Sequence, residues 1–210
     1  MLMRHTADTM NVASIRRTYR WMAPLYDPLF ERFYRSLRGE SIASLRIQPT
    51  DVVVLVGAGT GLDIGHLPKA SRVIAIDLTS AMLRRAATTY GSRADYVLGD
   101  GTSLPLRDAR VSVVILHLVL SVAADPEGLL LEAARVLQVG VRVAILDHFA
   151  PAGRVSLWRR MLARFPAILG THMDRQFEDL TLPPSFNVLE DRRLARGMCR
   201  SVILERIQSQ

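Results

Sequence analysis

A glycine-rich turn is the first feature of this sequence that could do chemistry. Residues 57–61 read Gly-Ala-Gly-Thr-Gly and follow an apolar, β-branched run at 51–56. Glycine tolerates positive φ angles and lets bare backbone approach a ligand closely. The dinucleotide-binding fingerprint is disfavoured, because it needs glycine where Leu62 stands. A phosphate-binding P-loop is excluded, because no lysine followed by serine or threonine comes after the turn.

Two acidic residues extend this pattern. Asp77 ends the next apolar run, where a carboxylate can accept hydrogen bonds from both ribose hydroxyls of a nucleoside. Asp100, between Gly99 and Gly101, follows the third run and can accept from an exocyclic amino group such as that of adenine. Either acid alone could be a helix cap or a turn residue. Three such features at the ends of three successive strands indicate a nucleoside-binding site.

The elements that must position these residues alternate between strand and helix. Near-continuous apolar runs are typical of parallel strands buried on both faces. Helices are expected from Thr79 or Ser80 to about Tyr90, and after the capping residue Asp125 with Pro126 in the first turn. The sequence therefore predicts a doubly wound α/β sheet with helices on both faces. The expected strands of this core are 51–56, 73–76, 96–98, 111–118 and 141–146.

Two flanking segments complete the expected domain. Residues 1–50 form an N-terminal helical arm that is amphipathic and basic, because apolar residues recur every three to four positions with arginines between them. Residues 51–150 form the core. Residues 151–210 form a tail with a helix at 154–165 and a closing antiparallel hairpin, whose strands at 186–189 and 201–207 flank the charged segment 190–196.

Composition limits the possible functions. The single cysteine, Cys199, can form neither an intramolecular disulfide nor a zinc cluster, and no metal is expected. The longest apolar stretch without charge, 111–124, is shorter than the roughly 20 residues of a membrane span. With no secretory signal, we expect a cytoplasmic protein. The net charge of +7 favours an anionic partner, either a membrane surface, a nucleic acid or an acidic substrate.

Taken together, the motifs resemble those of the class I S-adenosylmethionine-dependent methyltransferases of the ubiquinone/menaquinone methyltransferase type, over nearly the whole chain. This resemblance implies a Rossmann-like, seven-stranded, mostly parallel sheet and S-adenosylmethionine as the cofactor. The glycines of the turn would face the methionine part, Asp77 the ribose, and Asp100 with Gly101 the adenine. The residues that carry the resemblance are 54–61, Ile76, Asp77, Met82, Leu83, Gly99, Asp100, 104–106, Glu132 and 135–137. The cofactor-binding residues it implies are Gly57, Ala58, Gly59, Thr60, Gly61, Asp77, Leu78, Met82, Asp100, Gly101, Thr102 and His117.

Within that superfamily the closest resemblance is to bacterial phospholipid N-methyltransferases. It rests on Ser121-Val122 with Asp125-Pro126, on 147–149 (Asp-His-Phe), and on 19–27 in the arm. Those enzymes methylate phosphatidylethanolamine at a membrane surface, which agrees with a basic amphipathic arm that can lie on anionic headgroups. The chain would then be peripheral on the inner membrane face.

The sequence departs from the family pattern at two places. Leu55 stands where an acidic residue usually precedes the glycine turn, and 139–141 (Val-Gly-Val) replaces a usual Pro-Gly-Gly. The first departure removes an expected contact to the amino group of the cofactor. A cofactor-binding protein without catalysis is therefore one alternative, and a methyltransferase of a quinone or another small molecule is a second.

Methyl transfer is an in-line displacement, so the protein mainly has to align the acceptor and exclude water. An amine acceptor also needs a free lone pair, and His148, Tyr26 and Tyr19 are the catalytic candidates for accepting its proton. Each also has an ordinary structural alternative. His148 could be a hydrogen-bonded residue at the end of a strand, and the two tyrosines could pack the arm onto the core. The arginines of the arm and of 154–164 lack interleaved aromatics on a predicted sheet face, and no recognised nucleic-acid module is present, so a small-molecule or lipid acceptor is expected and nucleic acid is not.

Overall fold

The computed structural model describes residues 34–69, 72–149, 175–197 and 199–208. Two of the catalytic candidates, Tyr19 and Tyr26, lie outside the described residues. The same holds for the predicted tail helix at 154–165. Within the described ranges, no helix is long and apolar enough to cross a membrane.

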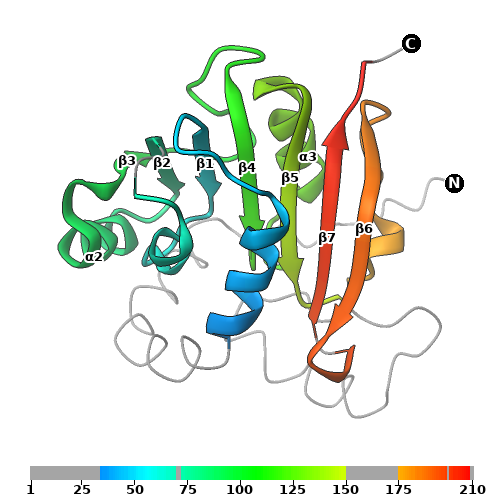
Figure 1. Cartoon of the computed structure of the whole chain (residues 1–210), viewed down its shortest axis with the longest axis horizontal. Coiled ribbons are helices and arrows are strands. Elements are labelled where there is room, and N and C mark those ends of the chain that lie inside the picture. The colour runs from blue at the N-terminus through cyan, green and yellow to red at the C-terminus, as the bar shows by residue number, and fades with distance from the viewer. Residues whose placement is uncertain (1–33, 70–71, 150–174, 198, 209–210) are drawn as a thin grey trace, which may run out of the picture.

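One sheet of seven strands organises the part of the chain that the structure describes (Figure 1). Its order is β3-β2-β1-β4-β5-β7-β6, with β1 to β5 parallel and β7 antiparallel to both neighbours. This confirms the predicted mostly parallel, doubly wound sheet and its closing hairpin. The strands are β1 Val52–Val56, β2 Arg72–Asp77, β3 Asp95–Leu98, β4 Val111–His117, β5 Leu137–Asp147, β6 Phe186–Leu194 and β7 Cys199–Arg206.

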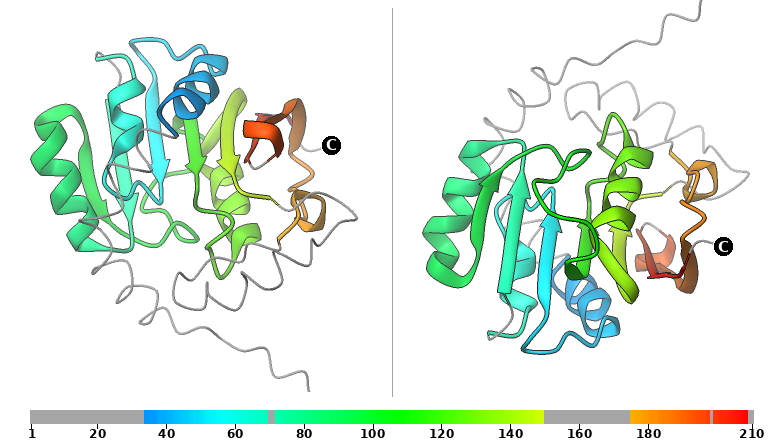
Figure 2. Two further views of the ribbon diagram at one scale, coloured as in Figure 1. Left: turned by 90° about the horizontal axis from the view of Figure 1, so that it is seen from below. Right: turned by 90° about the horizontal axis from the view of Figure 1, so that it is seen from above.

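The sheet is covered on both faces because side chains alternate along each strand. Val54 and Val56 of β1 face a core formed with α3 (Pro126–Val136) and the 3-10 helix η4 (Phe177–Asp179). Val53 and Leu55 face the opposite core, with residues from a helix at 34–44 and from the 3-10 helix η1 (Leu62–His66). Figure 2 shows helix 34–44 and α3 on opposite sides of the sheet.

Helix boundaries follow the local sequence. As predicted, α3 begins after Asp125, whose side chain accepts a hydrogen bond from the Gly128 backbone N–H at 2.8 Å, with Pro126 in the first turn. The predicted helix near Tyr90 is α2 (Ser80–Tyr90), which follows Thr79 and packs against β2 and β3.

The hairpin differs from the prediction at one place. The charged segment 190–196 was expected to lie between the two strands, but β6 extends to Leu194 and pairs with β7 along its full length. The reason is that β6 is an edge strand whose outer side faces water, so charged side chains are tolerated there. A strand search based on apolar residues misses such a segment.

Four buried polar residues, Arg38, Ser41, Asp63 and His117, attach helix 34–44 to the body. Arg38 donates to Asp63 Oδ2 at 2.6 Å, His117 Nδ1 lies 2.7 Å from Asp63 Oδ1, and Ser41 Oγ lies 3.1 Å from His117 Nε2. Burial acts to raise the pKa of Asp63, but Arg38 and His117 outweigh it and hold that pKa well below its usual range. We call these residues the Asp63 network. It joins the helix, η1 and the end of β4.

Replacing Asp63 with asparagine is expected to lower the free energy of unfolding by about 3 kcal/mol, because Arg38 would lose its buried counter-charge. Urea denaturation at pH 7 measures this change. The matched control is Asp95→Asn, which removes an exposed carboxylate 3.5 Å from Arg72 and should cost less than about 1 kcal/mol. Equal losses in the two variants would contradict a dominant role for the network.

The depressed pKa of Asp63 also predicts how the stability difference between wild type and Asp63→Asn depends on pH. A carboxylate whose folded pKa is depressed stabilises the fold above its ordinary pKa, near 3.8, and loses that effect as the pH falls toward the folded pKa. The difference in unfolding free energy between wild type and Asp63→Asn should therefore be full above about pH 5 and shrink in stronger acid. A difference that stays constant down to pH 2 would contradict the depressed pKa.

Candidate active site

The glycine turn lies at the carboxyl end of β1 and has the backbone that its sequence predicts. Gly57 and Gly59 have φ angles of 68° and 55°. A Cβ at Gly57 would lie 2.5 Å from Val119 Cγ2, so only glycine fits there. A Cβ at Gly59 would meet no described atom within 4 Å. The turn therefore packs tightly on one side and leaves its backbone open on the other, where a ligand can approach.

Asp77 lies directly beside this turn. Its Oδ2 accepts a hydrogen bond from the Gly59 N–H at 2.8 Å, and its Oδ1 accepts from the Thr79 N–H at 2.7 Å. Burial raises the pKa of Asp77, and these two N–H groups partly offset that effect. A carboxylate has about four lone-pair positions, so capacity remains for the hydroxyls of a ribose.

The Asp100 loop comes next along the same edge of the sheet. The Gly99 N–H donates to the Asp77 carbonyl at 3.1 Å, which places the two acidic positions side by side. Asp100 is exposed, and its Oδ1 accepts from both the backbone N–H and the hydroxyl of Thr102, at 2.9 and 2.8 Å. A Cβ at Gly101 would lie 2.5 Å from Val56 Cγ1 and from Leu129, so the loop passes close to the end of β1.

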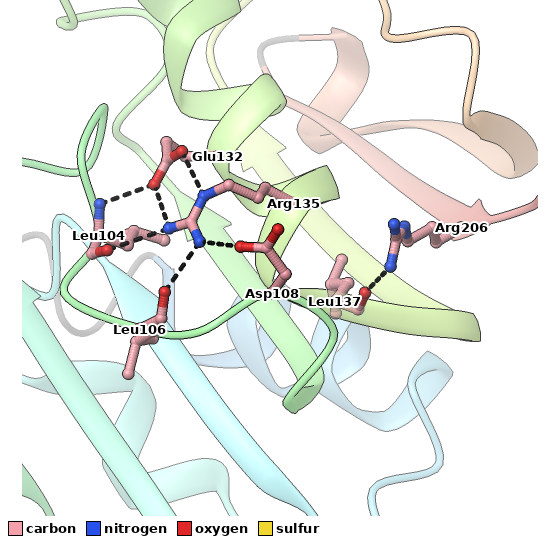
Figure 3. Close-up of polar contacts among 7 residues, drawn as sticks. All are labelled: Leu104, Leu106, Asp108, Glu132, Arg135, Leu137 and Arg206. Atoms are coloured by element: carbon pink, nitrogen blue, oxygen red, sulfur yellow. Dashed lines mark hydrogen bonds and ion pairs between the residues drawn. The ribbon is translucent and has the colours of Figure 1, made fainter. Parts of the chain in front are cut away.

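Glu132 and Arg135 of α3 hold the continuation of this loop (Figure 3). Glu132 accepts from the Leu104 N–H at 2.8 Å, and Arg135 donates to the carbonyls of Leu104 and Leu106 at 3.1 and 2.9 Å. Arg135 also pairs with Asp108 at 2.5 Å. These contacts give the family motif at Glu132 and Arg135 a structural role, which is to fix the loop that starts at Asp100.

The other predicted cofactor residues gather around the same edge. The Ala58 N–H donates to the Ile76 carbonyl at 3.0 Å, Thr60 and Leu78 are partly exposed, and Met82 is buried. His117 is different, because both of its ring nitrogens already contact partners of the Asp63 network. Its contact with a cofactor stays a prediction, as do those of the other residues.

Leu55 occupies the position where the family usually has an acidic residue. Its side chain is 1% exposed and packs in the core with Ala58 and Ile64. The buried carboxylate of this region is instead that of Asp63, on η1. Sequence reasoning missed this carboxylate, because Asp63 has the appearance of an ordinary first-turn acid.

A second cluster lies where β5 ends. The Nε2 atom of His148 is hydrogen bonded to the Tyr34 hydroxyl, and the two rings meet edge to face with centroids 5.5 Å apart. The other ring nitrogen, Nδ1, lies 3.7 Å from Cys199 Sγ. Burial, followed by the charge of Asp147, raises the pKa of the Cys199 thiol to about 11, so the thiol stays protonated. Tyr34 was not among the predicted site residues.

Asp147 fixes this cluster to the loop that follows β4. It is fully buried, and its carboxylate accepts from the backbone N–H groups of Ser121 and His148 at 2.9 and 2.7 Å. The carbonyls of Leu120 and Ala123 in the same loop accept from Arg175, the first described residue after the core. His148 is thus held beside the loop whose Val119 contacts the glycine turn.

Comparison with known proteins gives a consistent result. Residues 54–145 match the methyltransferase domain family. The chain is 29% identical over 194 residues to the phosphatidylethanolamine N-methyltransferase of Cereibacter sphaeroides, covering 90% of this chain and 95% of that protein. It is 30% identical over 117 residues to the arsenite methyltransferase of Halobacterium salinarum, covering 52% of this chain and 30% of that protein.

A solved structure shares the fold over almost the whole chain. The 1,6-didemethyltoxoflavin N1-methyltransferase of Burkholderia thailandensis, with bound 1,6-didemethyltoxoflavin and S-adenosylhomocysteine, superposes with a TM-score of 0.68 at 16% identity. The match covers 99% of this chain and 94% of that one.

The described edge of the sheet fits S-adenosylmethionine. The open side of Gly59 and the spare lone pairs of Asp77 suit a nucleoside with a free ribose, and the exposed Asp100 carboxylate suits an adenine amino group. The matched methyltransferase domain runs from β1 to β5, and a methyltransferase relative aligns almost end to end, so this chain is similar over nearly its whole length to the class I S-adenosylmethionine-dependent methyltransferases.

Proposed function

We propose that the chain methylates the amine of phosphatidylethanolamine, or of its methylated derivatives, at a membrane surface. The observation that carries this proposal is the likeness to a phosphatidylethanolamine N-methyltransferase over 90% of the chain, which extends well beyond the shared cofactor domain. The net charge of +7 agrees with work at an anionic surface.

In this proposal the glycine turn and Asp77 hold the cofactor, which supplies a methyl group on a positively charged sulfur. The acceptor amine is protonated in water and must lose a proton before its lone pair can attack. His148 is the base for that proton, because it is half-buried at the sheet edge and held by neighbours on both sides.

Tyr34 positions this base. When its hydroxyl donates to Nε2, the ring proton resides on Nδ1 and points toward Cys199 Sγ. The tyrosine is 3% exposed and the cysteine 1%, so both hold the imidazole from the protein side. Rotation of Tyr34 away from Nε2 leaves that nitrogen to the incoming ammonium group.

Two alternatives have observations of their own. The structural neighbour from Burkholderia thailandensis contains a small heterocycle, which favours a quinone or another small-molecule acceptor. The buried Leu55 favours a protein that binds the cofactor without turnover. The acceptor assay below distinguishes all three.

Incubation with labelled S-adenosylmethionine and phosphatidylethanolamine vesicles should place label in the lipid fraction. The rate should rise when an anionic lipid is included and fall with added salt, because charge attracts the protein to the surface. Label in a small quinone but not in lipid would support the first alternative. Cofactor binding without label in any acceptor would support the second.

Asp77→Asn should weaken the binding of S-adenosylhomocysteine roughly tenfold to a hundredfold, since hydrogen bonds to a charged acceptor contribute about 1.5–3 kcal/mol. Isothermal titration calorimetry measures the dissociation constant. Asp95→Asn, at the opposite end of the neighbouring strand, is the matched control and should bind like wild type. An unchanged constant for Asp77→Asn would remove Asp77 from the cofactor site.

Replacing His148 with glutamine should lower kcat by about 10²–10⁴-fold, the usual contribution of a general base. Tyr34→Phe keeps the ring and removes only the hydroxyl, so it should lower kcat by less and leave cofactor affinity unchanged. The double variant should lose no more than His148→Gln alone, because Tyr34 acts through that imidazole. Additive losses would instead show that the two side chains act independently.

A further inference from the structure

A buried carboxylate at the carboxyl end of β5 has no part in the chemistry proposed above. Asp147 is 0% exposed. Its Oδ2 accepts from the Ser121 N–H at 2.9 Å, and its Oδ1 accepts from the His148 N–H at 2.7 Å. These two N–H groups belong to different segments, because Ser121 lies in the loop after β4 and His148 follows β5. We call residues 118–123 the β4 loop. One side chain therefore joins this loop to the proposed base.

The β4 loop begins with a strained backbone. Leu118 has a φ angle of 57°, in the left-handed region that a leucine rarely adopts. Such a conformation persists only where the surrounding contacts enforce it, and it is frequent at functional sites. The Leu118 N–H donates to the Leu146 carbonyl at 2.7 Å, so the chain stays tied to β5 until it turns. Asp147 holds the same loop three residues later, at Ser121.

The carbonyl groups of the β4 loop are held from a third segment. Arg175 donates to the carbonyls of Leu120 and Ala123, and the Ala123 N–H donates to the Val119 carbonyl at 2.9 Å. A buried backbone group needs such a partner, because leaving it unpaired costs free energy. The conformation of the β4 loop therefore depends on Arg175 for its carbonyls and on Asp147 for an N–H.

The β4 loop reaches the glycine turn through Val119. A Cβ added at Gly57 would lie 2.5 Å from Val119 Cγ2 and 2.9 Å from Val119 Cβ. The valine side chain thus packs directly on the backbone of the first residue of the turn. The loop cannot move toward the turn without a clash, and movement away would remove the packing from that side of the turn.

The two contacts of Asp147 suit a carboxylate and not its isosteric amide. Each carboxylate oxygen accepts one N–H, and neither oxygen has to donate. Asparagine has only one acceptor oxygen, and its amide nitrogen would face an N–H group. The residue type at this position therefore decides whether the β4 loop and His148 are joined, although the side chain does not reach the surface.

We propose that Asp147 is a positioning residue of this site, which fixes the glycine turn relative to His148 through the β4 loop. The role of His148 in this inference rests on the proposed function, in which the methyl donor is held at the turn and the amine is deprotonated at His148. The alignment of donor and acceptor then depends on Asp147. In-line transfer is sensitive to alignment, because a misplacement of about 1 Å can cost about 10²-fold in rate.

The first test needs no acceptor. Binding of S-adenosylhomocysteine to the full chain should shift the imidazole NMR signals of His148, assigned with His148→Gln, because the β4 loop connects the turn to that residue. In Asp147→Asn the compound should still bind, but the shift should be largely lost. The matched control is Asp51→Asn, because Asp51 also accepts a backbone N–H, from Gln48 at 2.7 Å, and precedes β1 at the opposite end of the sheet.

Asp51→Asn should keep the full shift. A shift of wild-type size in Asp147→Asn, or no shift in wild type, would overturn the link between the turn and His148. Val119→Ala breaks the same link at its other end and leaves the buried carboxylate in place. It should also reduce the shift, and it keeps the proposal testable if Asp147→Asn does not fold.

Turnover gives a second measurement. Asp147→Asn should lower kcat about 10²-fold, with the KM for S-adenosylmethionine changed less than about threefold and the pH midpoint of kcat unchanged. Val119→Ala should lower kcat, and the double variant should lose no more than the larger single loss, since both residues act through one loop. Additive losses or a shifted midpoint would overturn the positioning role. Absence of methylation of any acceptor by wild type would overturn the proposed function, and the NMR shift would still decide the link.

Discussion

The placement of helix 34–44 depends on one buried carboxylate. Asp63 contacts Arg38 from that helix and His117 from the end of β4, and it lies on η1 directly after the glycine turn. A buried charge is tolerated only with well-placed partners, so the three segments cannot slide relative to one another without exposing or orphaning it. The position of Tyr34 beside His148 follows from that constraint.

The glycine turn, Asp77 and Asp100 are brought together by the topology of the sheet. Parallel strands bring their carboxyl ends to the same side of the sheet, so residues far apart in sequence meet there. Asp77 contacts the glycine turn through Gly59, and the backbone of Gly99 contacts Asp77. Glu132 and Arg135 then fix the following loop from α3. A ligand at this edge is surrounded by groups whose positions are set by the strands and not by the ligand.

Much of this could be predicted from the sequence, because the relevant signals are local. The buried strands are apolar runs, the turn is a glycine pattern, and Asp77 and Asp100 sit at the ends of those runs. The Asp63 network could not be predicted, because Asp63 and His117 meet across the fold and neither carries a local signal. The same applies to Tyr34, which has the spacing of an ordinary apolar helix residue. The length of strand β6 was underestimated, because an edge strand need not be apolar.

The two edges of the sheet differ from its buried centre in a way that concerns assembly. One edge, β3, is only four residues long, and the other, β6, exposes the charged residues Glu190, Asp191, Arg192 and Arg193. Short strands and charged side chains both hinder a further strand from pairing with an open edge. Both edge strands therefore hinder the addition of a strand from another molecule. When many copies of the protein collide at high local concentration, the described edges β3 and β6 are poor templates for intermolecular strand pairing.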